Sequence, residues 1–358
     1  MKNGQIIVDA VFHPWNLSPA NQNPRGRAQL DAVHASHKLA LDEANRSYQL
    51  TEAEIFSDID FDALAHAEFV ESPVDLAVIH ALPCLGFTLG NVTDPDRAAA
   101  LRDRNPDRFR LYGTVGTPIG EGAIDELKRQ ADELGIDGVK LYPALYYDNQ
   151  ATGWRLDGED FATPLLEAAR KLGITRVAIH KALWLEPAPR EAFDIDDMDS
   201  PLDRFSDMTF EMVHGGTAFL DQTIDLMQRH SNLYLTLETT FSYLLVKPRV
   251  FAKVIGRLIK AVGSDRLLFA SGNNLAHPAP LLTAFDGYQF PDALIEEFGI
   301  EPLTDTDRAN ILGDNALRLH GLVVADVVSA TADDEFARAR ARHVPEPWAA
   351  LRKPRQAA

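Results

Sequence analysis

Several side chains that can transfer protons or hold anions stand at the ends of short apolar runs in this sequence. Histidines follow three such runs, at His13, His180 and His214. Lys140 lies in a fourth run, and Glu238 directly follows a fifth. Because imidazole titrates at about pH 6.5, histidine can take up or release a proton near neutrality, while lysine and glutamate can stabilise the charges that develop. If the fold brings them together, these residues predict an acid–base site.

The elements that must position these residues are eight short apolar or β-branched runs. Each is followed by a longer segment with helical spacing of its apolar residues, such as FATPLLEAARKLG. We expect strands at residues 5–12, 75–81, 109–115, 138–142, 176–180, 209–213, 233–237 and 266–270. Such alternation indicates parallel strands joined by crossover helices, and eight of them favour a (β/α)8 TIM barrel of the α/β class. A doubly wound open sheet is the alternative, although no G-x-G-x-x-G follows the first strand.

We expect one barrel domain over residues 1–322 and a helical extension over 323–358. Two insertions follow the first and fifth strands, at 14–72 and 184–207, and we interpret the run DIDDMD in the second as a solvated acidic loop. In a barrel, segments after strand ends build the functional face. We therefore assign substrate binding to Trp15, Glu238 and Asn273, and to Arg204 as a clamp for a carboxylate. A surface ion pair is the alternative for Arg204.

The composition narrows the classes of partner. Asp and Glu total 53 against 35 Lys and Arg, a formal net charge of -18, which repels nucleic acid and anionic membranes. No run approaches the roughly 20 apolar residues of a membrane helix. The single cysteine, Cys84, fits a reducing compartment. We expect a cytoplasmic protein with a small-molecule substrate and with no nucleic-acid or membrane partner, and the formation of a homo-oligomer stays open.

Six segments resemble a known family. VDAVFHPW, GVKLYPA, VAIHKAL, EMVHGG, LLFASGNN and ILGDNALRLHGL are similar, in order and spacing, to segments of the amidohydrolase superfamily, in particular the group with decarboxylases, hydratases and lactone hydrolases of aromatic breakdown. The resemblance spans about residues 6–322. It implies a barrel whose first strand ends in H-x-H, whose fifth and sixth strands carry histidines, and whose eighth strand ends in an aspartate that binds metal or acts as a base.

The chain departs from that pattern at two positions. Val11 stands where the first histidine of the H-x-H pair is expected, and Gly272 stands where the aspartate is expected. A catalytic zinc normally takes three protein ligands, so these changes weaken the implied metal site. We therefore expect that no cofactor is required. One divalent metal such as zinc stays open as an alternative, bound by His13, His180 and His214, or by two of these histidines with Lys140 or Glu238.

These residues favour a hydrolase that acts on a small cyclic ester-like or carboxylated metabolite, in aromatic or other small-molecule catabolism. His180 or His214 would be the base, Lys140 or His13 would polarise the carbonyl, and Glu238 would orient a histidine or receive the proton. The first alternative is a metal-dependent decarboxylase or hydratase on the same scaffold, because a fold does not dictate its reaction. The second is a catalytically silent barrel that binds a ligand.

Overall fold

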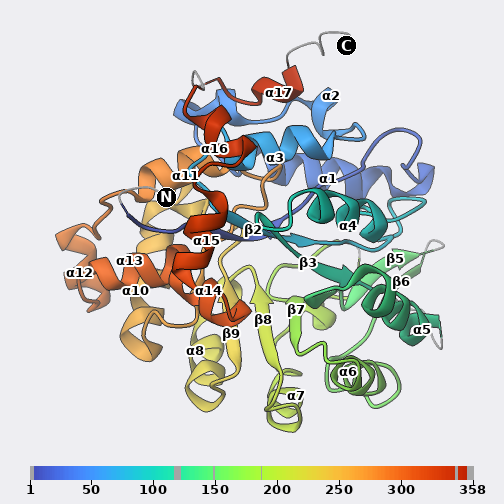
Figure 1. The fold of residues 1–358 in the computed structure, drawn as a ribbon. Helices are drawn as coiled ribbons and strands as arrows, with labels where there is room; N and C mark the ends of the chain where they lie inside the picture. The colour runs from blue at the N-terminus through green and yellow to red at the C-terminus, as the bar shows by residue number, and fades with distance from the viewer. Residues whose placement is uncertain (1–3, 117–121, 148–149, 187, 343–345, 353–358) are drawn as a thin grey trace.

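Eight parallel strands form the centre of the structure, a computed structural model that describes residues 4–116, 122–147, 150–186, 188–342 and 346–352 (Figure 1). Each strand pairs with the next along the chain of barrel strands. The strands are β1 (Val8–Phe12), β2 (Leu76–His80), β3 (Phe109–Thr114), β4 (Gly138–Leu141), β7 (Arg176–His180), β8 (Thr209–Val213), β9 (Leu233–Thr236) and β10 (Leu267–Leu268).

Backbone hydrogen bonds between the first strand and the residues that follow the last strand close the barrel. The Ala10 amide donates to the Phe269 carbonyl at 2.9 Å, and the Gly272 amide donates to the Val11 carbonyl at 3.0 Å. An open sheet would leave both of these edges without partners. The predicted (β/α)8 barrel is therefore confirmed, with each of the eight strands inside or within one residue of its predicted range.

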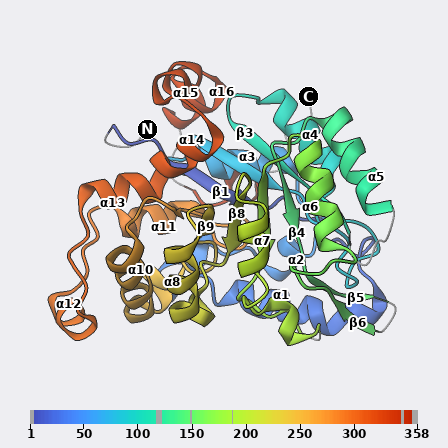
Figure 2. The same cartoon turned by 90° about the horizontal axis from the view of Figure 1, so that it is seen from below.

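Helices cover the outside of the strands (Figure 2). The longest, α10, buries Phe251, Val254, Ile255 and Leu258, whose spacing of three or four residues places them on one face. Among the described residues, no helix combines the length and apolar character needed to cross a bilayer. The helices are α1 (Arg27–Lys38), α2 (Glu52–Ile55), α3 (Phe61–Phe69), α4 (Pro95–Arg104), α5 (Gly122–Arg129), α6 (Ala162–Lys171), α7 (Asp199–Arg204), α8 (Leu220–Arg229), α9 (Tyr243–Val246), α10 (Pro248–Val262), α11 (Pro278–Phe285), α12 (Asp292–Phe298), α13 (Asp305–Ala309), α14 (Asn315–His320), α15 (Val324–Thr331), α16 (Glu335–Arg340) and α17 (Ala349–Arg352).

The second insertion is fixed by a buried ion pair. Lys181 Nζ lies 2.7 Å from Asp197 Oδ2, and both side chains are fully buried. The same Asp197 oxygen accepts from the Leu156 amide at 2.8 Å. The interpretation of DIDDMD as a solvated loop was therefore wrong at Asp197, because the lysine after β7 offers a buried cation that offsets the cost of burying this carboxylate. An antiparallel hairpin, β5 (Ala144–Tyr147) and β6 (Gln150–Gly153), follows β4 and was not predicted.

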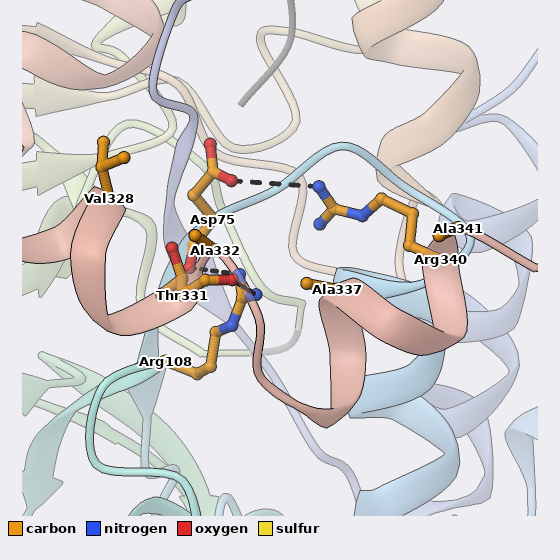
Figure 3. A pocket seen from close by; sticks show the side chains of 8 residues that line it. All are labelled: Asp75, Arg108, Val328, Thr331, Ala332, Ala337, Arg340 and Ala341. Atoms are coloured by element: carbon orange, nitrogen blue, oxygen red, sulfur yellow. Dashed lines mark hydrogen bonds and ion pairs between the residues drawn. The ribbon is translucent and has the colours of Figure 1, made fainter.

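The C-terminal helices are tied to the end of the barrel opposite the predicted site. Arg108, almost fully buried, donates to the carbonyls of Asp75 at 2.8 Å and Thr331 at 3.1 Å and pairs with Asp334 at 2.6 Å. Figure 3 shows this shallow cleft, with Arg340 of α16 facing Asp75 across it. Because Arg108 uses its N–H groups on these partners, its hydrogen bonds attach α15 and α16 to the barrel.

Candidate active site

The residues proposed for chemistry meet at the C-terminal end of the barrel. His180 ends β7, while His13, His214 and Glu238 follow β1, β8 and β9 by one or two residues. Side chains alternate between the two faces of a strand, which directs this set inward. Four are linked by contacts, and the fifth, Lys140 of β4, is fully buried close enough for its charge to act on His13 and Glu238.

Three of these side chains form a row. Glu238 Oε2 lies 2.9 Å from His214 Nδ1, and His214 Nε2 lies 3.0 Å from His180 Nδ1. His180 Nε2 contacts the Leu183 carbonyl at 2.7 Å. The row therefore runs from a carboxylate through two imidazoles to a backbone oxygen.

The row has a direction that follows from which atoms can donate. The Leu183 carbonyl can only accept, so His180 carries its proton on Nε2 and accepts at Nδ1. His214 must then donate from Nε2, and its Nδ1 faces Glu238. Burial raises the pKa of Glu238, but the charge and hydrogen bonding of His214 outweigh it and lower the pKa to about 2. The ionised carboxylate of Glu238 therefore faces His214 Nδ1 at the distance of an ion pair.

The other carboxylate oxygen of Glu238 lies on the side of His13. Oε1 lies 3.8 Å from His13 Nε2, too far for a hydrogen bond. Burial lowers the pKa of His13 to about 4, so this imidazole is neutral at physiological pH. Trp15 stacks on it at 6.1 Å, and its buried indole nitrogen has no hydrogen-bond partner among the described residues.

Sequence reasoning missed His80, which belongs to the same cluster. It ends β2, is fully buried, and packs its ring edge against His13 at 5.8 Å. The signal was available, because LAVIH ends in a histidine in the same way as VAIH and EMVH do. A strand-end histidine on the second strand should have joined the others.

Backbone strain gathers where the strands end. Ala182, His214, Thr239 and Asn273 have positive φ angles of 58°, 73°, 63° and 48°, and each stands within five residues after the end of a barrel strand. Such conformations cost non-glycine residues of the order of 1–3 kcal/mol and cluster at functional sites. The strained residue His214 is held by Thr240, whose hydroxyl donates to its carbonyl at 2.7 Å. The strain supports a functional role for this end of the barrel.

Two of the proposed substrate-binding residues lie away from the row. Arg204 pairs with Glu159 at 2.8 Å and with Glu167 at 2.9 Å on the surface, as in the alternative considered for it. Asn273 is buried, but its amide donates to Glu68 of α3, outside the ring of strands. The structure therefore does not bring either side chain together with His13, His214 and Glu238.

Comparison with known proteins places this barrel in a family. The family profile described as Amidohydrolase matches residues 9–322. The chain belongs to this amidohydrolase family. Among curated protein sequences, none matches significantly.

Solved structures share the fold of this amidohydrolase. A TIM-barrel protein from Bordetella bronchiseptica has a TM-score of 0.60 at 20% identity, covering 88% of this chain and 98% of its own. A 2,6-dihydroxybenzoate decarboxylase from Rhizobium has a TM-score of 0.52 at 15% identity, covering 89% and 98%. A 5-carboxyvanillate decarboxylase from Novosphingobium aromaticivorans, with bound manganese, has a TM-score of 0.54 at 17% identity, covering 89% and 97%.

A metal does not fit the present arrangement of the amidohydrolase site. Throughout the described ranges, no three His, Cys, Asp or Glu side chains converge on a point that could hold an ion. Both ring nitrogens of His180 are engaged, by His214 and by the Leu183 carbonyl. The ammonium group of Lys140 acts on the same cluster and would repel a dication.

The two departures from the family pattern can now be located. Val11 lies in an apolar cluster with Val8, Ala10 and Ala270. Gly272, in the left-handed region at φ 75°, lies against Glu238, because a Cβ there would stand 2.8 Å from Glu238 Oε1. The Glu238 carboxylate thus occupies the space next to the position of the expected aspartate. A carboxylate that follows the seventh strand of the barrel thus lies beside the position, after the eighth strand, where the family pattern places an aspartate.

Proposed function

We propose that this amidohydrolase is a lyase that removes the carboxylate of a small hydroxylated aromatic acid and protonates the carbon left behind. The observation that carries the proposal is the Glu238–His214 pair, in which one carboxylate oxygen lies 2.9 Å from an imidazole nitrogen and the other lies on the side of His13. The names of two neighbours in the fold comparison, both aromatic acid decarboxylases, support the substrate class.

The electrostatics of the pair favour proton donation over water activation. A carboxylate with a pKa of about 2 is a weak base for water, and the adjacent His214 imidazole is a group that can supply it with a proton. Oε2 faces His214, so a reacting atom can approach only Oε1. Gly272 leaves that oxygen accessible, because any side chain there would press against it.

The reaction then balances with this chain's own residues. His214 Nδ1 gives a proton to Glu238 Oε2, and rotation of the carboxyl group then presents this O–H to the ring carbon that bears the carboxylate. The carbon–carbon bond breaks, its electron pair returns to the ring, and carbon dioxide leaves. His214 recovers its proton from water, and the bond from His180 Nδ1 keeps its ring in place. Lys140 would hold an oxygen of the substrate while charge shifts.

Hydrolysis of a cyclic ester is the second candidate, and Lys140 is the observation that favours it. Burial lowers the pKa of this lysine to about 7, although the charges of Glu238 and Glu211 raise it. A lysine that is partly neutral at pH 7 can take a proton from water. Proton donation by Glu238 would then assist the leaving oxygen.

Decarboxylation in heavy water separates the two reactions. We expect purified protein to release carbon dioxide from 2,6-dihydroxybenzoate or 5-carboxyvanillate and to leave deuterium on the vacated ring carbon, as detected by proton NMR. His214→Asn and Glu238→Gln should each lower the rate by about 100-fold or more. Arg170→Ala, which removes a half-exposed partner of Asp207, is the control and should keep the rate.

Two outcomes would overturn the proposal. One is hydrolysis of aromatic lactones without carbon dioxide release from any acid in a panel of hydroxybenzoates. The other is equal rates in wild type, His214→Asn and Glu238→Gln. The metal content of each sample, measured with and without added manganese and after chelation, would show whether the side chains act alone.

A further inference from the structure

His80 has an unusual environment for a buried histidine. Its side chain is fully buried, and neither ring nitrogen has a hydrogen-bond partner among the described residues. Its ring stacks flat on Tyr112 at 5.0 Å with 9° between the planes. The stacking fixes the ring while the nitrogens stay unsatisfied, and each buried unsatisfied polar atom costs of the order of 1–3 kcal/mol. A group that is so costly and so well positioned indicates a ligand.

Lys140 presents the same signature beside it. Its ammonium group is fully buried and has no hydrogen-bond partner in the part of the chain that the structure describes. The ring of Tyr142 lies 5.0 Å from Nζ and offers a cation–π contact, which does not replace a hydrogen-bond acceptor. The charge of Lys140 is, after burial, the main cause that lowers the pKa of His80. The strand register agrees: His80 pairs with Tyr112 of β3, and Tyr112 pairs with Gly138 of β4, so Lys140, two residues further along β4, lies on the same face of the sheet as His80.

The carboxylates nearby do not satisfy these donors. Glu211 accepts a short hydrogen bond from the Tyr112 hydroxyl, and Glu238 Oε2 faces His214. Both carboxylates act on Lys140 through their charge, but neither forms a hydrogen bond with it. His13 closes another side, with its Nδ1 directed at the His80 carbonyl at 3.4 Å. The unmet donors of His80 and Lys140 thus remain for an outside acceptor.

We propose that His80 and Lys140 form the receptor for an oxygen anion of the substrate, a phenolate next to the carboxylate that leaves. The inference rests on the proposed function and narrows its substrate class to acids with an ionisable hydroxyl ortho to the carboxylate. Lysine offers three N–H groups and a neutral histidine offers one, while a phenolate oxygen has several lone pairs to receive them. Charge-assisted hydrogen bonds of this kind are the strong ones.

The placement suits the reaction. Electrons from the broken carbon–carbon bond return to the ring, and an oxygen ortho to that carbon carries much of the resulting charge. Cationic and N–H donors fixed at that oxygen stabilise the charge without reorganisation.

Binding of 2-nitroresorcinol tests the receptor without turnover. The name of one structural neighbour, a dihydroxybenzoic acid decarboxylase, gives this molecule as its inhibitor, and its visible absorbance reports whether a hydroxyl is ionised. We expect wild type to bind it as the phenolate at a pH where free probe is mostly neutral. His80→Phe keeps the stacking on Tyr112 and Lys140→Met keeps the chain length. Each should weaken binding by about tenfold or more and lower the ionised fraction of bound probe.

His320→Phe is the matched control. His320 is a second histidine beside Tyr112, with ring centroids 5.8 Å apart, and it belongs to α14. Its replacement disturbs the same tyrosine and should leave probe affinity and ionisation unchanged. Equal effects of His80→Phe and His320→Phe would overturn the receptor, as would unchanged binding in Lys140→Met.

The outcomes distinguish this inference from the proposed function. Probe bound as phenolate in a manner that depends on His80 and Lys140, without decarboxylation of any acid, would uphold the receptor and reject the lyase. Decarboxylation with probe binding unaffected in both variants would uphold the lyase and reject the receptor. Folding of each variant is checked by its thermal unfolding midpoint before binding is measured.

Discussion

A buried lysine without a hydrogen-bond partner destabilises a protein at any pH where it should be charged. Lys140 is fully buried, and burial lowers its pKa to about 7, against about 10.5 in an unfolded chain. Between these values the folded protein binds fewer protons than the unfolded one. The free energy of unfolding therefore rises with pH over this window, and the full cost of the lysine is present below it.

Lys140→Met should separate function from stability. We expect the variant to lose activity and to gain about 1–3 kcal/mol in free energy of unfolding at pH 6, because an apolar side chain of similar length replaces an unpaired charge. The rise in stability between pH 7 and pH 10 should shrink. Urea denaturation at pH 6 and pH 9.5 measures both effects. Lys128→Met, at an exposed lysine paired with Asp132, is the control, and a less stable Lys140→Met would contradict the argument.

At the scale of elements, the loops after β9 and β10 bring two positions together at the proposed site. Glu238 follows β9, and a side chain at Gly272 after β10 would meet its carboxylate. Glu238→Gly should lower turnover by about 100-fold or more, and Gly272→Asp alone should also fail, because two carboxylates would crowd one space.

The double variant Glu238→Gly with Gly272→Asp should recover at least about tenfold over Glu238→Gly. Aspartate tolerates the left-handed backbone at position 272 better than most residues do. The neutral pair Glu238→Gly with Gly272→Asn is the control for shape. Turnover is measured for both single variants and both double variants. If Glu238→Gly with Gly272→Asp is no faster than Glu238→Gly with Gly272→Asn, the two positions act independently.

A second pair of carboxyl groups joins β1, α3 and the loop after β10. Asp9 accepts hydrogen bonds from the backbone amides of Val11 and Ser271, both at 3.0 Å. Glu68 accepts a hydrogen bond from the side-chain amide of Asn273. Burial raises the pKa of Asp9 to about 7, with its hydrogen bonds opposing, and burial and then the charge of Asp9 raise that of Glu68. The folded protein thus holds a proton that the unfolded chain releases from about pH 4. Stability should fall as pH rises from there through 7.

Asp9→Asn should remove this dependence, since its amide replaces the shared proton at every pH. We expect wild type to lose roughly 1–3 kcal/mol of unfolding free energy between pH 5 and pH 8, and the variant to lose clearly less. Denaturation curves at the two pH values provide the comparison. Asp107→Asn, at an exposed position, should behave as wild type. A variant with the wild-type slope would rule out the shared proton.

Sequence patterns predicted the elements better than the contacts between them. Short apolar or β-branched runs marked all eight strands, and strand-end position placed His13, His180 and His214 at one end. The buried pair of Lys181 and Asp197 was not predictable, because it depends on how an insertion folds back. The departure at Gly272 suggested a lost carboxylate, whereas its compensation by Glu238 depends on a spatial contact between neighbouring strands.

At the scale of the whole molecule, the C-terminal helices are bound to the first insertion around α3. Helices α16 and α17 contact α3 (Figure 1). Trp348 is almost fully buried, and its indole donates to the Tyr48 carbonyl at 2.8 Å in the first insertion. Glu71, directly after α3, accepts from the amides of Trp348 and Ala349, both at 2.7 Å. The C-terminal extension is thus part of the core rather than an appended tail.

His277 connects the contacts around Trp348 with the loop after β10. Its ring lies 3.0 Å from Glu71 and packs against the Trp348 ring at 4.7 Å. Trp348→Ala should therefore lower the free energy of unfolding by about 3–5 kcal/mol and speed hydrogen exchange in α3 and in the loop that carries His277. Trp184→Ala, at a tryptophan that is 40% exposed, is the matched control and should cost less than about 1 kcal/mol. Equal losses in the two variants, or exchange confined to α17, would mean that the end of the chain rests on the barrel without supporting the loop.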